Sequence, residues 1–78
     1  VLGYGTVGYV GHAGYVGLAA NSFAGGNQYV VMQNATNGDA FFNAPTGRAI
    51  YTRIQNANVY VTDATGIEFA AGKNIGTN

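Results

Sequence analysis

Short apolar runs separated by small polar residues fill the chain from residue 27 onward. Each run is five to seven residues long and rich in Val, Ile, Tyr, Phe and Thr. Runs of this kind, bounded by Asn, Gly, Pro or Asp, are typical of strands joined by tight turns. The pattern therefore predicts an all-β chain with five strands here: Gln28–Gln33, Asp39–Ala44, Ala49–Gln55, Asn58–Thr62 and Gly66–Ala70.

The alternation of apolar and polar positions says which residues these strands bury. Side chains two residues apart share one face of a strand. Two of the runs, Val30–Met32 and Phe41–Phe42, are apolar throughout, which indicates burial on both faces. One small sheet has no second layer of its own for that, so we expect neighbouring chains to supply it. The residues expected to face the interior of such an assembly, or the next chain, are Phe41, Phe42, Ile50, Ile54, Val59 and Val61.

The first twenty residues follow a different rule, with glycine at every third position from Gly5 to Gly17. Such triplets are typical of the collagen triple helix, but collagen also needs abundant proline, which this stretch lacks. The hexapeptide repeat of left-handed β-helices is an alternative, although only two units, VGYVGH and AGYVGL, are present. A third alternative is a tightly wound segment in which three chains meet at one axis, and a fourth is a flexible linker.

These differences divide the chain into three parts. We expect a shaft segment over residues 1–20, a junction over 21–26 and a short-strand β-repeat segment over 27–78. The chain opens at Val1 without Met or a signal segment, which indicates a piece of a longer polypeptide.

Composition points to association. A chain of 78 residues makes one small domain, and such domains usually need disulfides, a metal or oligomerisation. There is no Cys, so oligomerisation is the expected device. Charged residues are only 8% of the chain and the formal net charge is zero, which favours association. Three cations cannot form a phosphate-binding stripe, so we expect no nucleic-acid partner, and no apolar run of 18 residues predicts a membrane span.

Several motifs occur in a telling order: Asn43-Ala44-Pro45-Thr46-Gly47, then Arg53-Ile54, then Val61 through Gly66-Ile67. This order resembles the repeat units of trimeric bacteriophage tail fibres and tailspikes over residues 27–74. The resemblance implies an intertwined, fibrous homotrimer, either a triple-stranded β-helix or a β-prism-like shaft. It further implies a structural segment of a viral fibre or spike that acts in host attachment on the virion. The partners it implies are two further copies of the chain and a host cell-surface polysaccharide.

Few side chains are candidates for chemistry. His12, the only His, would place three imidazoles around a threefold axis, which is a metal-binding arrangement. A single packed or exposed His is commoner, so we predict no metal and no cofactor. Glycosidase chemistry needs two carboxylates roughly 5–9.5 Å apart. Since Asp39, Asp63 and Glu68 share no motif, we expect turn roles for the aspartates, no catalytic residue and no enzyme.

The remaining polar and aromatic features have two interpretations each. Arg48 and Arg53 either pair with acids of a neighbouring chain, which would fix strand register, or contact an anionic polysaccharide. The aromatic residues fit packing better than sugar stacking. The GxGxxG match over Gly3–Gly8 lacks the flanking strand and helix of a nucleotide site, so it is a coincidence.

Two further functions stay open beside the fibre hypothesis. Glycine, tyrosine and valine with little charge also suit a self-assembling β-fibril. The chain is alternatively a fragment of a polysaccharide-degrading tailspike whose catalytic residues lie elsewhere.

Overall fold

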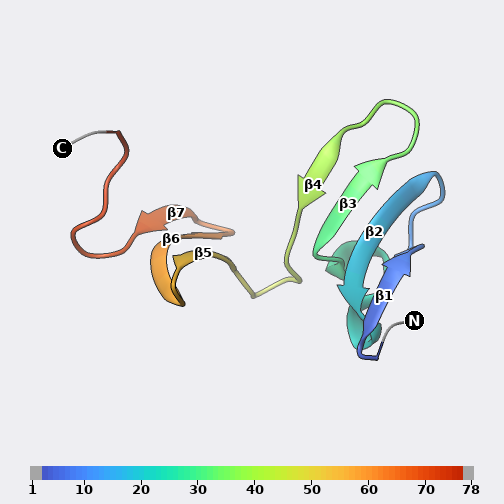
Figure 1. Ribbon diagram of the computed structural model, residues 1–78, viewed down its shortest axis with the longest axis horizontal. Coiled ribbons are helices and arrows are strands. Elements are labelled where there is room, and N and C mark those ends of the chain that lie inside the picture. Colours follow the sequence, from blue (N-terminus) through green and yellow to red (C-terminus); the bar gives the residue numbers. More distant parts are fainter. Residues whose placement is uncertain (1–2, 77–78) are drawn as a thin grey trace. The chain divides into compact units, whose positions relative to one another are not determined.

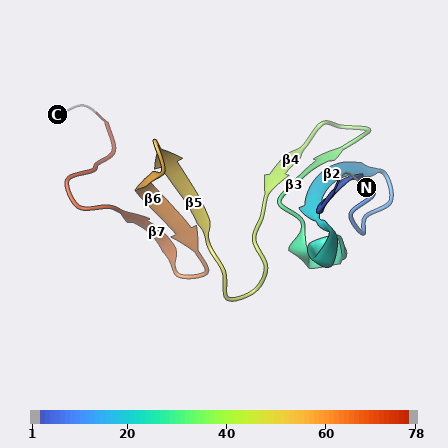
Figure 2. The same ribbon diagram turned by 60° about the horizontal axis from the view of Figure 1, so that its bottom comes forward.

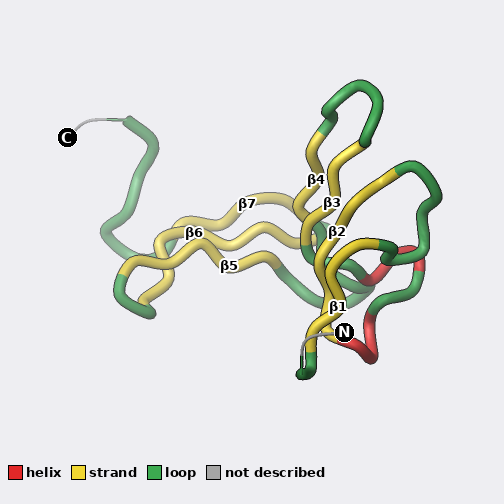
Figure 3. Tube along the Cα trace, turned by 45° about the vertical axis from the view of Figure 1, so that its right-hand side comes forward, coloured by secondary structure: helices red, strands yellow, loops and turns green. Residues whose placement is uncertain are grey.

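Antiparallel pairing of neighbouring strands builds the whole structure, a computed structural model that describes residues 3–76. Seven strands form two separate sheets, and the only helices among these residues are two single turns of 3-10 helix (Figures 1 and 3). The all-β prediction is confirmed. The chain forms two units, Val1–Thr46 and Gly47–Asn78, each with one sheet, and they are described separately.

The first unit holds a four-stranded meander in the order β1-β2-β3-β4. Its strands are β1 (Gly5–Gly8), β2 (Tyr15–Ala20), β3 (Val31–Asn34) and β4 (Ala40–Phe42). Between β2 and β3 the chain makes the two helical turns η1 (Asn21–Phe23) and η2 (Gly26–Gln28). Both turns lie behind this sheet in Figure 1 and to one side of it in Figure 2.

The second unit is a three-stranded meander in the order β5-β6-β7. Its strands are β5 (Ile50–Ile54), β6 (Ala57–Asp63) and β7 (Gly66–Phe69). Gln55 and Asn56 join β5 to β6 with positive φ angles of 48° and 68°, as a two-residue hairpin loop requires. A register shift between Thr52 and Arg53 marks a bulge in this pairing.

Four of the five predicted strands, β4 to β7, lie within two residues of their predicted bounds. The fifth differs more, since β3 begins at Val31 and not at the predicted Gln28. Gly26, with a φ of 63°, starts the η2 turn, and the chain re-enters the sheet only where the Val30 N–H donates to the Leu18 carbonyl at 2.9 Å.

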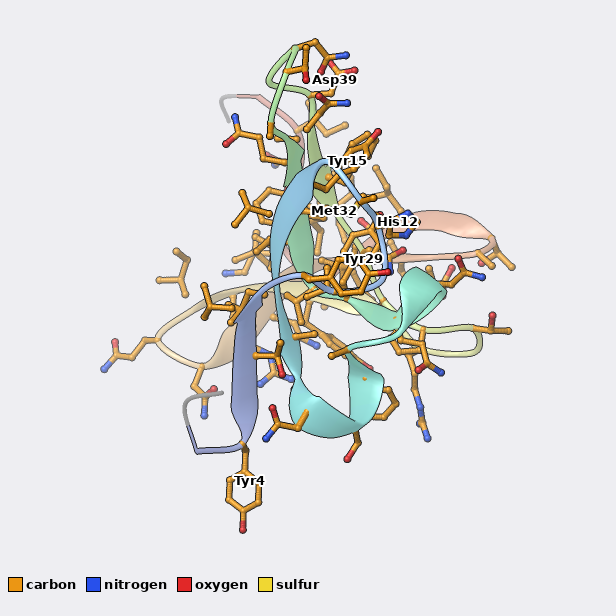
Figure 4. The ribbon with its side chains drawn as sticks, turned by 90° about the vertical axis from the view of Figure 1, so that its right-hand side faces the viewer. Tyr4, His12, Tyr15, Tyr29, Met32 and Asp39 are labelled. Carbon is orange, nitrogen blue, oxygen red and sulfur yellow. The ribbon has the colours of Figure 1, made fainter. Side chains whose placement is uncertain are left out.

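A small apolar core lies on one face of the first sheet. Val10, Ala19 and Met32 are buried, and Tyr15, Ala24 and Tyr29 pack around them. Figure 4 shows Tyr15, Tyr29 and Met32 gathered with His12, whereas Tyr4 points away. The Gly26 N–H donates to the Val10 carbonyl at 3.1 Å, so the loop after β1 and the η2 turn are held over this face.

The glycine-triplet segment forms an antiparallel hairpin within one chain. Residues 5–20 supply β1 and β2, which pair from Gly5↔Ala20 to Gly8↔Gly17, so neither a collagen-like helix nor a hexapeptide coil describes them. The expected close approach of backbones is present, but inside the chain. A Cβ on Gly11 would overlap the backbone nitrogen of Gly26, and one on Gly17 would lie 2.5 Å from a Val10 methyl group.

Residues 21–26, the predicted junction, belong to the first unit, and their backbone is bonded to residues that flank β1. Asn21 donates twice: its N–H donates to the Tyr4 carbonyl at 2.7 Å, and its side-chain amide donates to the Gly3 carbonyl at 2.8 Å.

Replacing Gly11 by Ala should destabilise the first unit strongly. The new Cβ would collide with the backbone of Gly26. The alanine would also have to adopt the φ of 107° at this position, a backbone conformation that residues with a Cβ rarely adopt. Overpacking and the left-handed backbone together cost roughly 2–4 kcal/mol of unfolding free energy. Chemical denaturation followed by circular dichroism measures this loss.

Gly25→Ala is the matched control. Gly25 has a φ of −141° and open space where a Cβ would stand. This variant should unfold at nearly the same denaturant concentration as the parent. Equal losses in the two variants would show that the close approach at Gly11 is unimportant.

Candidate functional site

The first sheet leaves one face without a second layer. The strand register places four apolar residues directly opposite one another across all four strands: Val7, Leu18, Val31 and Phe42. Val16, two residues before Leu18, lies on the same face. We call these five residues the open face. Val7 is 58% exposed, Val16 49%, Leu18 42% and Phe42 77%, which is unusual for side chains of this size.

The open face is also hollowed. A depression of about 420 Å³ is lined by its five residues together with Gly17, Met32, Gln33, Ala40 and Phe41. The opposite row of the same strands, Gly8, Gly17, Met32 and Phe41, faces the core described above. One sheet therefore has a covered face and an apolar face that nothing among residues 3–46 covers.

The second sheet has an apolar face as well. The register aligns Ile50 with Ile67, on either side of Thr62, and aligns Tyr60 with Phe69. The rings of Tyr60 and Phe69 lie 5.6 Å apart between centroids, and Ile67 is 62% exposed. Among residues 47–76 no residue is buried, so this sheet has no core of its own. We call Ile50, Tyr60, Ile67 and Phe69 the second apolar face.

This register separates two of the residues expected to face the interior or the next chain. Ile50 and Val61 lie on opposite faces of the second sheet, because Ile50 is opposite Thr62 whereas Val61 is opposite Tyr51 and Glu68. They cannot both face one interior. The open face in β2 also has a signal in the sequence, since Val16 and Leu18 alternate with the smaller residues Gly17 and Ala19, but the regular glycine spacing is the more conspicuous pattern there.

His12 takes part in the packing of its own chain. Its Nε2 lies 2.9 Å from the Gly26 carbonyl oxygen, and its ring meets Tyr15 and Tyr29 edge-on at 5.9 and 5.8 Å. Residues 3–76 contain no group of three or more potential metal ligands. The histidine thus ties the loop after β1 to the η2 turn.

Two of the three acids share a surface. Asp39 lies in the first unit at the β3–β4 turn (Figure 4), whereas Asp63 and Glu68 lie on the same face of β6 and β7 as diagonal neighbours. Diagonal neighbours have Cα atoms about 7–8 Å apart. Sequence spacing alone had not indicated this proximity.

Asp63 is engaged in its turn. One carboxylate oxygen accepts the Thr65 N–H at 2.9 Å and the Thr65 hydroxyl at 2.7 Å. These bonds, the hydroxyl first, hold the pKa of Asp63 below its ordinary value. A carboxyl group with a lowered pKa stays ionised at neutral pH. The turn role expected for this residue is confirmed.

A second hollow, of about 590 Å³, is lined by Arg48, Tyr51, Asp63 and Thr65, with Gly47 and two alanines. Within the described chain, Arg48 makes no ion pair or side-chain hydrogen bond. Arg53 behaves differently. Its Nε donates to the Asn58 amide oxygen at 2.7 Å, and its guanidinium carbon lies 5.1 Å from the centre of the Tyr51 ring. Arg48 is therefore the arginine that remains available to a partner.

No protein family model matches this chain, and no curated protein or solved structure is significantly similar to it. The resemblance carried by Asn43–Gly47, Arg53-Ile54 and Val61–Ile67 stays a prediction. Within residues 3–76, neither helical turn approaches the length of a membrane-crossing helix.

Thr65→Val should raise the pKa of Asp63 toward its ordinary value. The substitution removes the hydroxyl donor and keeps the backbone donor. A pKa lowered by folding stabilises the fold above the ordinary pKa, and this contribution disappears as the pH falls through the lowered pKa. The variant should thus lose stability at neutral pH and match the parent in strong acid. NMR titration of the carboxyl carbon and acid-dependent melting measure both effects.

The control is Thr52→Val, on the face of the second sheet opposite to Asp63. It should leave the Asp63 titration unchanged. A Thr65→Val protein that titrates like the parent would mean that the hydroxyl bond does not set this pKa.

Proposed function

We propose that this chain is a structural segment of a homotrimeric viral tail fibre or spike, present on the virion and involved in attachment to the host. The observation that carries the proposal is the second sheet, which has an apolar face and not one buried residue among residues 47–76. Such a surface needs another layer, and further copies of the chain supply one.

The physical argument starts from how sheets are stabilised. A sheet that is apolar on one face must bury that face against another layer, and a single three-stranded layer has little stability of its own. The first sheet meets this need on its covered face through Val10, Ala19 and Met32, but not on its open face. Both units therefore leave an apolar surface for association.

Charge and sequence order support copies of the same chain as the partners. Three cations and three anions in 78 residues give little repulsion between copies. The threefold symmetry and the viral role rest on the resemblance of residues 27–74 to tail-fibre repeats. In a shaft of that type, strands of three chains close around one axis.

A host cell-surface polysaccharide is the partner proposed for the hollow around Arg48. Its lining offers the guanidinium group of Arg48, the Tyr51 ring at 54% exposure and the ionised carboxylate of Asp63, to which the Thr65 hydroxyl donates. A sugar is recognised by such a set: the guanidinium group and the carboxylate form hydrogen bonds with its hydroxyl groups, and the ring covers its apolar face.

A self-assembling fibril is the second candidate, favoured by the free edges of both sheets. β1 and β4 end the first sheet, and β5 and β7 end the second. Unpaired edges recruit further strands unless charge or covering elements prevent it. The third candidate, a fragment of a polysaccharide-degrading spike, draws on the proximity of Asp63 and Glu68.

The trimer proposal predicts a mass of about 24 kDa in solution, three times the 8.0 kDa of the chain. Native mass spectrometry and light scattering at micromolar concentration measure it. Unfolding should be cooperative and should shift to higher temperature as concentration rises, because association stabilises the folded state.

A folded 8.0 kDa monomer with a cooperative melt would contradict the proposal. Long filaments with a meridional repeat of about 4.7–4.8 Å would favour the fibril instead. New reducing ends released from a capsular polysaccharide would favour the enzyme fragment.

A further inference from the structure

We propose that the Asn37–Gly38 pair in the β3–β4 turn is a site of spontaneous deamidation, which converts Asn37 into a mixture of aspartate and isoaspartate. The reaction needs only water, and the hydrogen bonds of the turn control its rate. The inference concerns a single chain and does not rest on the proposed homotrimer. It assigns a modification site to a turn that the proposed function does not use.

The sequence singles out this pair. Asn37 is the only Asn in the sequence that is followed by Gly. Deamidation begins when the backbone nitrogen of the following residue attacks the side-chain carboxamide, and a following Gly leaves that nitrogen unshielded because it has no Cβ. Asn37 and Gly38 are both exposed, and Figure 4 shows Asp39 near the tip of the same hairpin, so water reaches the reacting atoms.

The side chain of Asn37 is folded back toward the next peptide. Its Oδ1 accepts the N–H of Asp39 at 2.9 Å. This bond closes a ring of the Asx-turn type, which runs from the carboxamide through the Gly38 peptide to the nitrogen of Asp39. The carboxamide carbon is therefore held close to the Gly38 nitrogen. The N–H of Asp39 also points at the oxygen on which negative charge develops during the attack.

One hydrogen bond holds the attacking nitrogen back. The Gly38 N–H donates to the Asn34 carbonyl at 3.0 Å, and the nitrogen cannot attack until this bond is released. The Asn34 side chain stabilises the same turn, because its oxygen accepts the N–H groups of Thr36 and Asn37 at 2.8 and 3.0 Å. The rate of deamidation therefore depends on local opening of the turn, which exposed loops undergo more readily than a core.

The reaction balances with water as the only other reactant. A base in the solvent takes the Gly38 amide proton, and the nitrogen forms a bond to the carboxamide carbon of Asn37. The Nδ2 group takes up a proton and leaves as ammonia, which gives a five-membered imide. Water then opens the imide at one of its two carbonyls. Cleavage at the side-chain carbonyl gives aspartate, and cleavage at the main-chain carbonyl gives isoaspartate.

Either product changes the first unit. Asp39 is the only Asp, Glu, Lys or Arg among residues 1–46, so a second carboxylate two residues away doubles the negative side-chain charge of this unit. Isoaspartate also adds one carbon to the backbone inside the loop that is closed by the Asn34 N–H and the Asp39 carbonyl at 2.8 Å. The modification should therefore weaken the pairing of β3 with β4.

Asn21, which precedes the small residue Ser22, is the internal comparison. Its side chain is held at both ends, since Oδ1 accepts the Thr6 hydroxyl at 2.6 Å and Nδ2 donates to the Gly3 carbonyl at 2.8 Å. Ser22 in addition has a Cβ that shields its nitrogen. We expect this residue to react only after Asn37.

The first test is incubation of the parent chain at mildly alkaline pH, followed by tandem mass spectrometry. We expect Asn37 to be the first Asn that exchanges its amide for a carboxyl group, with both products present. Gly38→Ala should remove this early product. Both chains are also measured in denaturant, because the Cβ of the alanine shields the nitrogen in an unfolded chain as well. Deamidation that starts at another Asn would overturn the site.

The second test separates the turn from the local sequence. Asn34→Ala removes two hydrogen bonds from the turn and leaves the reacting pair intact. Asn37 should then deamidate roughly two- to tenfold faster, the factor that corresponds to one ordinary hydrogen bond. Asn43→Ala is the matched control, because its side chain also makes two hydrogen bonds, to the carbonyls of Asn27 and Tyr29 outside the turn. This variant should deamidate at the parent rate.

Circular dichroism verifies that both variants keep their strands. Equal rates in the parent and in Asn34→Ala would overturn the control by the turn. Equal acceleration in both variants would overturn it too, since unfolding of the whole unit would then limit the reaction. These readouts are covalent changes within one chain, so a parent that never forms trimers would contradict the proposed function and leave this inference in place.

Discussion

The packing of Val10, Ala19 and Met32 is the interaction on which the first unit depends. It holds the loop after β1 and the η2 turn against one face of a four-stranded sheet, with the Gly26–Val10 and His12–Gly26 hydrogen bonds at its border. Once this face is covered, the apolar row from Val7 to Phe42 must point the other way. The same packing that stabilises the unit thereby creates the surface that we assign to association.

Asparagine side chains form many of the hydrogen bonds that hold the turns and connecting segments of the first unit. The side-chain amide of Asn43 donates to the carbonyls of Asn27 and Tyr29 at 2.8 and 3.0 Å, which fixes the segment that leads into β3. The amide oxygen of Asn34 accepts the N–H groups of Thr36 and Asn37 in the β3–β4 turn. Neutral amides satisfy these backbone groups without adding repulsion between copies, so turn chemistry and self-association are compatible in one short chain.

Several elements followed from the sequence because their causes are local. The runs around Phe41, Tyr51, Tyr60 and Ile67 became strands near the predicted positions, since β-branched and aromatic residues between turn residues leave few alternatives. Asp63 took its turn role for the same reason. The glycine triplets do not indicate a triplet helix, because their three-residue spacing has two unrelated causes: left-handed backbone at Gly8, Gly11 and Gly14, and close approach at Gly11 and Gly17.

The sequence by itself determined the class of structure, the positions of most strands and the shortage of charge that favours association. Only the tertiary structure decided which side chains meet. Register aligned Val7, Leu18, Val31 and Phe42, which are far apart in the chain, and it placed Ile50 and Val61 on opposite faces of the second sheet. The physical reason is that a strand's own pattern gives two faces but not their partners. Pairing between strands sets which side chains share a face. Packing of the loop after β1 and the η2 turn against one face of the first sheet then decides which face is covered.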